Sequence, residues 1–264
     1  MIQSSINHNT FNFPVGEMQV TVDPEYMGPV DIEFIFEKNA DIIELLMFCD
    51  AVQRAGCKLG ELVMRYVPFS RQDRCNNKGE AFSLKVFCDL INGLNFRVVY
   101  ISDPHSDVTP ALLKNCVTIS QCDLLAQLIN RHVHAPFYLV APDAGALKKT
   151  HTLAKELYSP MFLGIIETSK LRNTQTGEIT GTVVHTPMLP TYTAVAGVVT
   201  TYVMVDDIID GGRTFIELAK ELRKKGAQQV YLFATHGFFT KGKEVFDGYI
   251  DLVRVANDYS ERFK

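Results

Sequence analysis

Residues 203–214 read Val-Met-Val-Asp-Asp-Ile-Ile-Asp-Gly-Gly-Arg-Thr, so an apolar run ends in two adjacent carboxylates, and a third precedes two glycines. From residue 215 to about residue 225 the apolar side chains recur at a helical spacing. A buried strand that delivers a glycine turn to a helix N-terminus can bind an anion, because backbone N–H groups converge there and the helix dipole adds partial positive charge. The adjacent Asp206 and Asp207 could hold sugar hydroxyls or a magnesium ion. The stretch therefore suggests a site for a ribose 5-phosphate moiety.

The same stretch could be an ordinary strand–turn–helix with a solvated acidic turn, which is the commoner explanation of a lone glycine pair. The full order of strand, paired aspartates, third aspartate, glycine pair and amphipathic helix is much rarer and favours the functional interpretation. It resembles the phosphoribosyl-pyrophosphate (PRPP) binding motif of the phosphoribosyltransferase fold. The resemblance implies that a 5-phosphoribosyl group is bound by Asp206, Asp207, Asp210, Gly211, Gly212, Arg213 and Thr214.

The composition is that of an ordinary globular chain: 264 residues, 47% hydrophobic, with a formal net charge of −4. This length suffices for one large or two ordinary domains. The negative charge argues against a nucleic-acid partner, which requires a basic face. The apolar segment 194–205 is interrupted by polar residues and indicates a buried strand, and the N-terminus lacks the features of a signal peptide. We therefore expect a cytoplasmic protein with no membrane partner.

Cysteine and histidine offer little evidence for a dedicated metal site. The six cysteines contain no Cys-x-x-Cys pair, which indicates reduced thiols in a cytosolic protein and argues against zinc. His132 and His134 could be metal ligands, but no partner cluster is nearby in sequence, which favours linker histidines.

Apolar runs alternate with helical patterns along the chain. Strands are predicted at 31–36, 61–67, 96–102, 136–141, 161–167 and 230–234, and helices at 41–54, 82–94, 109–114 and 147–157. This alternation predicts an α/β fold with mainly parallel sheets flanked by helices. The pattern is interrupted near residues 131–136, so we expect an N-terminal domain at 1–134 and a C-terminal domain at 135–264.

A second motif follows the strand predicted at 61–67. Residues 66–74 read Tyr-Val-Pro-Phe-Ser-Arg-Gln-Asp-Arg. Two arginines around Gln-Asp would usually be a solvated loop, but fixed arginines also suit bidentate recognition of a triphosphate. The segment resembles the Arg-Gln-Asp-Arg signature of ribose-phosphate pyrophosphokinases, or PRPP synthetases, a family that also has the PRPP motif. The resemblance implies that ATP is bound by Arg71, Gln72 and Arg74 in the N-terminal domain.

Further positions resemble the same family, over roughly residues 10 to 245. Phe13 and Glu17 match its nucleotide-base loop, His105 its catalytic histidine that serves magnesium–ATP, and Asp143 its other magnesium-associated residue. Lys170 and Arg172 resemble its mobile catalytic loop. Taken singly, His105 would more often be a turn histidine, and Lys170 with Arg172 a solvated pair. The resemblance also implies two similar domains, each like a type I phosphoribosyltransferase.

The chain departs from the family pattern at the phosphate loop. The family usually has Asp-Thr-Gly-Gly-Thr, whereas here the residues are Asp210-Gly211-Gly212-Arg213-Thr214. Val15 replaces an acidic residue of the base loop, and Cys75 replaces a basic residue after the Arg-Gln-Asp-Arg signature. Arg213 could point to solvent, or it could bind phosphate beyond a 5′-monophosphate.

The resemblance implies a magnesium-dependent pyrophosphokinase that transfers the β,γ-diphosphate of ATP, its co-substrate, to the 1-hydroxyl of ribose 5-phosphate, and that assembles as a homo-oligomer (dimer or hexamer). One alternative is the same chemistry on a 5′-substituted acceptor such as ADP-ribose. Another is a catalytically silent regulatory protein associated with PRPP synthetases. A phosphoribosyltransferase that consumes PRPP is a third, against which the two arginine-containing motifs argue.

Overall fold

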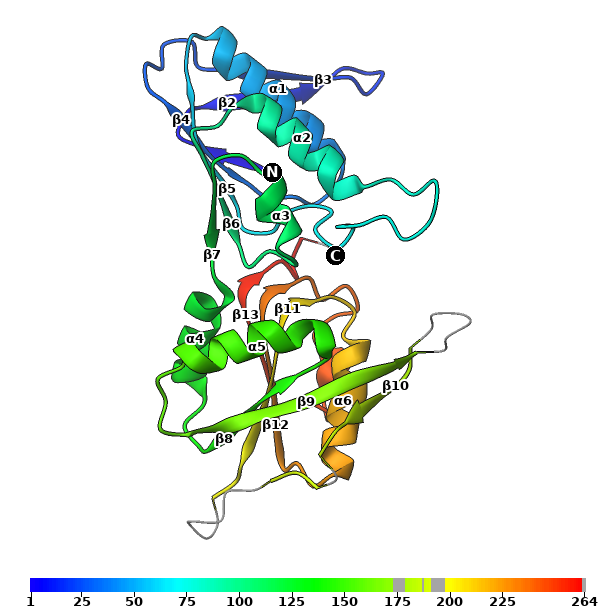
Figure 1. Cartoon of the computed structure of the whole chain (residues 1–264). Helices are drawn as coiled ribbons and strands as arrows, with labels where there is room; N and C mark the ends of the chain where they lie inside the picture. Colours follow the sequence, from blue (N-terminus) through cyan, green and yellow to red (C-terminus); the bar gives the residue numbers. More distant parts are fainter. Residues whose placement is uncertain (173–178, 187, 191–197, 263–264) are drawn as a thin grey trace. The chain divides into compact units, whose positions relative to one another are not determined.

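The computed structural model describes residues 1–172, 179–186, 188–190 and 198–262, with the side chains of residues 170–172 and 179–181 also outside the description. The chain divides into two compact units, Met1–Ile119 and Ser120–Lys264 (Figure 1). Each unit is built on its own sheet of mainly parallel strands. The α/β class predicted from the alternating pattern is therefore confirmed.

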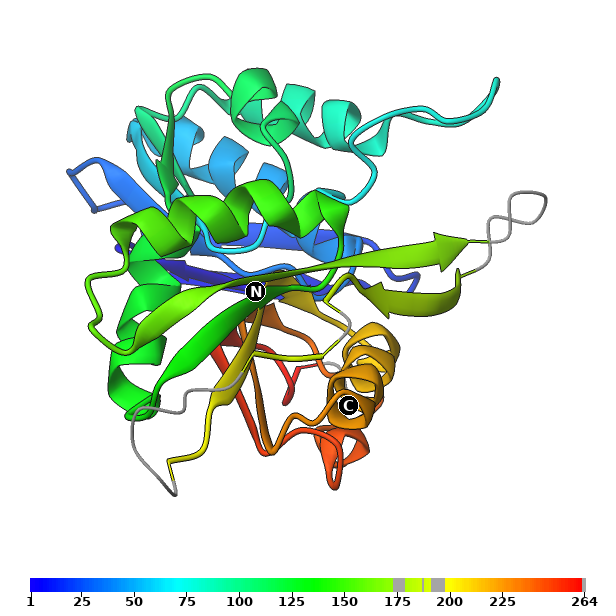
Figure 2. The same ribbon diagram turned by 60° about the horizontal axis from the view of Figure 1, so that its bottom comes forward.

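Unit 1 contains a five-stranded sheet in the order β1-β4-β5-β6-β7. Its strands are β1 (Ile2–Ser4), β4 (Val30–Phe34), β5 (Leu59–Met64), β6 (Val98–Ser102) and β7 (Cys116–Ile119), and only β1 runs antiparallel to its neighbour. The helices are α1 (Ala40–Arg54), α2 (Ser83–Leu94) and α3 (Val108–Leu112). A separate hairpin of β2 (His8–Asn12) and β3 (Met18–Val22) packs on α1. Figures 1 and 2 show α1 and α2 side by side.

Unit 2 contains a six-stranded sheet in the order β10-β9-β8-β11-β12-β13, with only the β9–β10 pair antiparallel. Its strands are β8 (Phe137–Ala141), β9 (Phe162–Arg172), β10 (Ile179–Val184), β11 (Thr201–Ile209), β12 (Gln229–Gly237) and β13 (Leu252–Asp258). Its helices are α4 (Gln121–His132), α5 (Ala144–Glu156), α6 (Arg213–Lys224) and the 3₁₀ turn η1 (Glu244–Phe246). Figure 2 shows β9 and β10 as a long hairpin that projects past the other strands.

Central strand β11 is buried on both faces, which explains why it reads as a continuous apolar run. Val203 and Val205 belong to the apolar cluster formed with α4 and α5. Tyr202 and Met204 belong to the cluster formed with α6. Because successive side chains of a strand point to opposite faces, one strand contributes to two cores. Helices on both sides of β11 thus fix the position of the acidic residues that follow.

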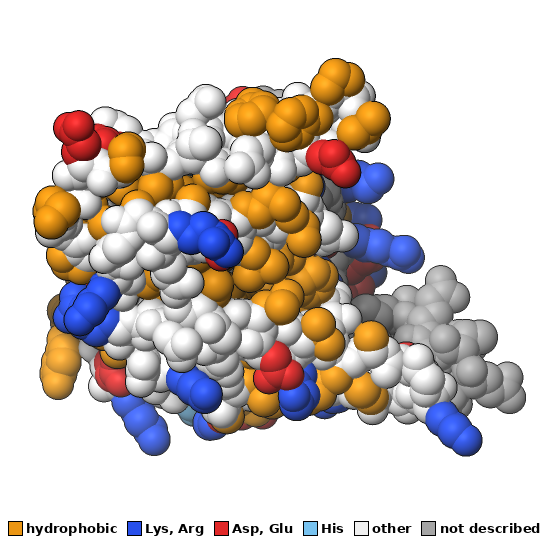
Figure 3. Space-filling model, turned by 90° about the horizontal axis from the view of Figure 1, so that it is seen from above, with side chains coloured by type: hydrophobic (Ala, Val, Ile, Leu, Met, Phe, Trp, Pro, Cys, Tyr) orange, Lys and Arg blue, Asp and Glu red, His pale blue; other side chains and the backbone are white. Residues whose placement is uncertain are grey.

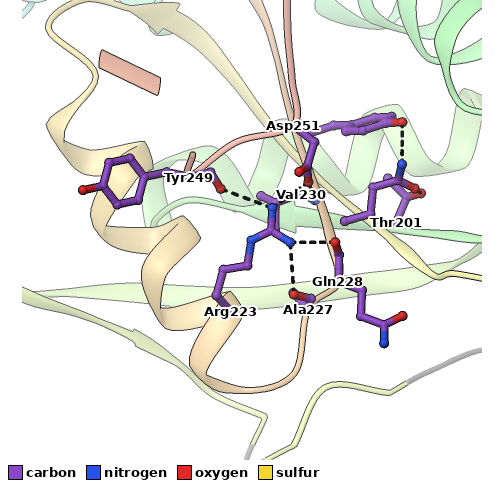
Figure 4. Close-up of polar contacts among 9 residues, drawn as sticks. Thr201, Arg223, Ala227, Gln228, Val230, Tyr249 and Asp251 are labelled. Atoms are coloured by element: carbon purple, nitrogen blue, oxygen red, sulfur yellow. Dashed lines mark hydrogen bonds and ion pairs between the residues drawn. The ribbon is translucent and has the colours of Figure 1, made fainter. Parts of the chain in front are cut away.

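Arg223 fixes the C-terminal end of α6 (Figure 4). Its guanidinium donates to the carbonyls of Ala227 at 3.2 Å and Gln228 at 2.6 Å, and lies 2.6 Å from Oδ2 of Asp251. The same Asp251 oxygen accepts the N–H of Val230 at 2.7 Å, which joins the entrances of β12 and β13. A cation in the last turn also interacts favourably with the helix dipole. These contacts lie at the amino ends of the strands and orient α6 so that its N-terminus lies at their carboxyl ends.

The predicted strands and helices are present within a few residues of their expected bounds, with two differences. The strand expected at 161–167 continues to Arg172. The apolar segment 194–205 contributes to a strand only from Thr201, and its residues up to 197 lie outside the described part of the chain.

The boundary between the units lies after Ile119, earlier than the boundary expected between residues 134 and 135. The reason is α4, which packs on α5, β12 and β13 and so belongs to unit 2. His132 is the last residue of α4, and His134 and Pro136 lie in the connection from α4 to β8. Among the described residues, no helix is long and apolar enough to cross a bilayer.

The α6 face that packs on the sheet should dominate the stability of unit 2. Leu218 is fully buried, so Leu218→Ala should lower the free energy of unfolding by about 2–5 kcal/mol through lost transfer energy and the cavity left behind. Urea denaturation would measure this. The neighbouring exposed substitution Glu217→Ala should change it by no more than about 0.5 kcal/mol, and an equal loss in both variants would contradict the assignment.

Candidate functional site

The glycine turn between β11 and α6 requires glycine at its second position. Gly212 is the N-cap residue of α6 and has φ +79°, a conformation that favours glycine. A Cβ there would lie 2.5 Å from Cζ of Phe246, whose side chain is buried. The Gly212 carbonyl accepts the N–H groups of Phe215 and Ile216, each at 3.0 Å. The helix therefore begins directly at the loop, as an anion site at its N-terminus requires.

Three carboxylates gather at the carboxyl ends of β8 and β11. Asp206 and Asp207 belong to the end of β11, and Asp143 follows β8 as the N-cap of α5. The two strands are parallel neighbours, so these ends meet at one edge of the sheet. The Asp207 N–H donates to Oδ1 of Asp206 at 2.9 Å, and Oδ1 of Asp143 accepts the N–H of Ala146 at 3.0 Å.

The surroundings of the carboxylate cluster disfavour the charged form of Asp206. Burial raises the pKa of Asp206 well above its ordinary range, and the charges of Asp207 and Asp143 raise it further. Lys149 on α5 lies with its Nζ 3.9 Å from Oδ2 of the buried Asp207. A cation or hydroxyl donors would stabilise the cluster, and a magnesium ion bound together with a sugar would supply both.

The loop after β12 borders the glycine turn. Thr240 donates its hydroxyl to Oδ1 of Asp210 at 2.6 Å. Lys241 lies close to Gly211, since a Cβ on Gly211 would be 3.3 Å from Cγ of Lys241. Arg213 is exposed and Thr214 is half-buried at the start of α6. All seven residues predicted to bind the phosphoribosyl group thus lie on one strand end, the turn that follows it and the first turn of α6.

Lys170 and Arg172 are at the end of β9, with Lys170 opposite Thr182 and Arg172 opposite Ile179 of β10. The sequence places these residues in a loop after the strand, and this expectation is corrected, because the backbone continues as strand through Arg172. Pairing with β10 accounts for the extension. The side chains of both residues, and residues 173–178, lie outside the described part of the chain, so their catalytic role stays a prediction.

In unit 1, the predicted base-loop residues lie at the tip of the β2–β3 hairpin. The Phe13 N–H donates to the Glu17 carbonyl at 2.7 Å and the Gly16 N–H to the Phe13 carbonyl at 2.8 Å, which close a tight turn. Phe13 is exposed and stacks edge-on with Phe11, with ring centroids 5.1 Å apart. An exposed aromatic ring on a fixed turn can stack on a nucleotide base.

The other predicted ATP residues occupy two loops that follow adjacent strands. Arg71, Gln72 and Arg74 come after β5, and His105 comes after β6; all four are exposed. Because β5 and β6 are parallel neighbours, both loops lie at one edge of the sheet. Asp73, buried within the first loop, hydrogen-bonds with Arg74 of the same loop and Ser106 of the second.

The structure therefore separates the predicted site residues into two groups. Unit 1 holds the hairpin tip and the two loops, and unit 2 holds the carboxylates, the glycine turn and the β9 end. The expected magnesium pair, His105 and Asp143, is divided between the units. Within the described residues, no three His, Cys, Asp or Glu side chains are grouped as a metal cage.

Sequence reasoning did not select Asp73, Lys149, Thr240 or Lys241. Asp73 lies inside the Arg-Gln-Asp-Arg motif, and this position in the motif could have indicated it. Lys149 follows Asp143 by less than two helical turns, and such spacing after a strand-end aspartate could have indicated a neighbour. Thr240 and Lys241 lie in a loop whose path depends on β12, and no local pattern indicates them.

Comparison with known proteins identifies relatives along most of the chain. The "N-terminal domain of ribose phosphate pyrophosphokinase" matches residues 5–94, and the "Phosphoribosyl synthetase-associated domain" matches residues 166–263. A ribose-phosphate pyrophosphokinase of Pyrococcus abyssi is 31% identical, with 90% of this chain and 78% of the relative covered. One of Thermococcus kodakarensis is 30% identical, with 87% and 77% covered.

A solved structure, phosphoribosylpyrophosphate synthetase from Mycobacterium smegmatis, matches with a TM-score of 0.77. The match covers 95% of this chain and 80% of that chain at 22% sequence identity. At this identity the likeness supports the fold.

The carboxylate cluster should reduce the stability of the unliganded protein. The folded-state pKa of Asp206 is raised, so the folded state binds more protons, and stability falls as pH rises above the ordinary carboxyl pKa of about 3.9. Asp206→Asn should therefore raise Tm at neutral pH, with no gain below about pH 4. Thermal melts across pH without magnesium would measure this. The exposed control Asp247→Asn should follow the wild-type profile, and an Asp206→Asn profile parallel to wild type would contradict the prediction.

Proposed function

The chain belongs to the ribose-phosphate pyrophosphokinase family, and on this premise we propose that it transfers the β,γ-diphosphate of ATP to the anomeric 1-hydroxyl of a 5-phosphorylated ribose, with release of AMP. Ribose 5-phosphate is the first acceptor to consider, and PRPP is then the product. The observation that carries the proposal is the acidic end of β11 followed by the Gly212 turn and the N-terminus of α6. This arrangement combines carboxylates for ribose hydroxyls with a backbone turn for phosphate.

The acceptor would occupy this edge of unit 2. Asp206 and Asp207 would accept hydrogen bonds from the 2- and 3-hydroxyls of the ribose. The 5-phosphate would lie at Gly211–Thr214, where Gly212 allows close approach of the backbone. Asp210 holds the Thr240 hydroxyl, which keeps the neighbouring loop against the turn.

ATP would be bound by unit 1. The exposed Phe13 ring would stack on the adenine and Glu17 would lie beside it. Arg71, Gln72, Arg74 and His105 would contact the phosphates, because planar guanidinium groups match phosphate oxygens with paired hydrogen bonds. Their convergence at one edge of the unit 1 sheet supports this assignment.

The residues present fit a magnesium cofactor. Burial and the neighbouring carboxylates raise the pKa of Asp206, which supports the proposal of a cation bound beside this cluster. Magnesium typically uses one or two protein carboxylates together with water and substrate phosphates, so a cage of three protein ligands is not required. The resemblance to the family assigns the ion to Asp143 and His105, and a bound magnesium would neutralise phosphate oxygens.

The transfer itself depends on positioning and charge. The anomeric oxygen forms a bond to the β-phosphorus of ATP while the bond from that phosphorus to the α–β bridging oxygen breaks, so that AMP leaves with the electron pair. The proton of the anomeric hydroxyl passes to solvent water. Such a transition state spreads negative charge over the transferred group and the leaving oxygen. Lys170 and Arg172 would stabilise this charge, a role that rests on their resemblance to the family's catalytic loop.

A second acceptor, ADP-ribose, is favoured by the altered phosphate turn. The Arg213 cation is exposed at the first position of α6, where the helix dipole disfavours it, so a bound anion would stabilise it. Lys241 adds charge beside Gly211. A threonine at position 211, as the family usually has, would bring its Cβ to 3.3 Å from Cγ of Lys241 and 3.7 Å from Oγ1 of Thr240. The terminal ribose of ADP-ribose offers the same anomeric hydroxyl, and its diphosphate could use these cations.

We also propose a homo-oligomer, dimer or hexamer, that works in the cytoplasm. Figure 3 shows apolar side chains gathered on the face that it views. The outer surfaces of α1 and α2 expose Ile43, Met47, Val86 and Leu90, which supports association of unit 1 with another protein surface. All six cysteines are free thiols, which agrees with a reducing compartment.

The acceptor can be identified by AMP release. Purified protein with ATP and magnesium would be given ribose 5-phosphate and ADP-ribose separately, and product masses determined. We expect a pyrophosphorylated product from a 5-phosphoribosyl acceptor and none without one. An adduct of ribose 5-phosphate alone would make Arg213 incidental, whereas an adduct of ADP-ribose alone would assign acceptor choice to the altered turn. No AMP with either acceptor, from folded protein, would contradict the proposal and favour the regulatory alternative.

Lys170 provides a test of the transition-state role. Lys170→Ala should lower kcat about 100-fold or more while the affinity for ATP changes little, because the interaction forms mainly as charge develops. Steady-state kinetics and calorimetric ATP binding would separate the two quantities. Lys155→Ala, an exposed lysine on α5, is the matched control. Equal losses in kcat and in ATP affinity for Lys170→Ala would count against the role.

A further inference from the structure

Asp73 differs from its neighbours in the Arg-Gln-Asp-Arg motif by pointing inward. Its side chain is 5% exposed, whereas Arg71, Gln72 and Arg74 are all exposed. A buried carboxylate is costly unless protein donors satisfy it. Its partners therefore indicate what it holds in place.

The partners of Asp73 come from two loops. Nε of Arg74 donates to Oδ1 of Asp73 at 3.0 Å, and the Ser106 side chain hydrogen-bonds with the same carboxylate. Burial alone would raise the pKa of Asp73, but the hydrogen bonds from Ser106 and Arg74 and the charges of Arg74 and His105 outweigh it and lower the pKa. The carboxylate is thus satisfied as an anion.

Ser106 extends the connection into its own loop. Its Oγ accepts the N–H of Val108 at 3.3 Å at the start of α3, while its hydroxyl proton is available to Asp73. Both loops also contain a residue with positive φ, Phe69 at +61° and Asp103 at +40°, so each is a tight, specific turn. Asp73 therefore joins the turn after β5 to the turn after β6.

We propose that Asp73 is a positioning residue for ATP, which holds the Arg74 guanidinium and the His105–Ser106 turn in the arrangement that binds the phosphates. The inference rests on the proposed function, because it assigns Arg74 and His105 to ATP. Removing the negative charge should free Arg74 to adopt other rotamers and loosen the second loop. ATP binding should weaken, while acceptor binding in unit 2 should not change.

Asp73→Asn is the first variant, because it keeps the shape and removes the charge. We expect the KM for ATP to rise roughly tenfold, as for loss of a charged hydrogen bond, with the KM for the acceptor unchanged. Calorimetry with magnesium–ATP alone should show the same loss of affinity. Ser106→Ala, which removes one donor at the far side, should show a smaller loss in the same direction. It also decides the question if Asp73→Asn fails to fold.

Two comparisons separate positioning from general destabilisation. If Asp73 acts through Arg74, the double variant Asp73→Asn with Arg74→Gln should lose little more ATP affinity than Arg74→Gln alone. Glu80→Gln is the matched control: Glu80 accepts the N–H groups of Asn76 and Asn77 in the next turn, and no contact described for it reaches Ser106. Its ATP affinity should stay at the wild-type level.

The outcomes are distinct. An Asp73→Asn protein that folds and binds ATP within about twofold of wild type would overturn the inference. Equal losses for ATP and acceptor, with a lowered Tm, would show a merely structural role and also overturn it. A wild-type protein that binds no magnesium–ATP would overturn the proposed function itself, and the inference with it.

Discussion

The parallel pairing of β8, β11 and β12 is the constraint on which unit 2 depends. Parallel strands bring their carboxyl ends to one edge, so Asp143, Asp206 and the loop that carries Thr240 meet although they are far apart in sequence. The opposite edge carries the Arg223–Asp251 contacts, which join α6 to the entrances of β12 and β13. The stabilising contacts and the proposed site thus lie at opposite ends of the same strands, as is usual for open α/β sheets.

Unit 1 follows the same rule with a shorter sheet. β5 and β6 are parallel neighbours, and the loops that follow them contain the arginines and the histidine assigned to ATP. A buried carboxylate, Asp73, joins these two loops through Arg74 and Ser106.

Much of this organisation could be predicted from sequence, and the failures have physical causes. β11 was predictable because burial on both faces makes it continuously apolar, and α1 because Ile42, Leu45 and Cys49 repeat at helical spacing. α4 was missed because its buried face is narrow, with Cys122, Leu125 and Ile129 among polar residues. β13 was missed because an edge strand is mostly exposed. The expected domain boundary lies later than the division between the two units because α4 was not recognised as a helix of unit 2.

Site residues show a similar division. Asp206, Asp207 and Gly212 could be proposed from sequence because a strand, a turn and a helix start must be adjacent in sequence. Lys149 and Thr240 were not, because their approach to Asp207 and Asp210 depends on tertiary packing. The role of Lys170 and Arg172 was inferred from a resemblance, and the extended backbone that β10 imposes on them was not foreseen.

Asp73 and Asp206 have pKa values shifted in opposite directions, which separates a carboxylate proposed to position other residues from one proposed to bind a ligand. The pKa of Asp73 is lowered because protein donors and cations outweigh its burial, so its charge is satisfied within the chain. The pKa of Asp206 is raised because burial is combined with other carboxylates, so the protein disfavours its charged form. A buried group that the protein itself stabilises is suited to hold other residues in place. A buried group whose charged form the protein destabilises is suited to bind a ligand, because ligand binding can then offset that unfavourable free energy.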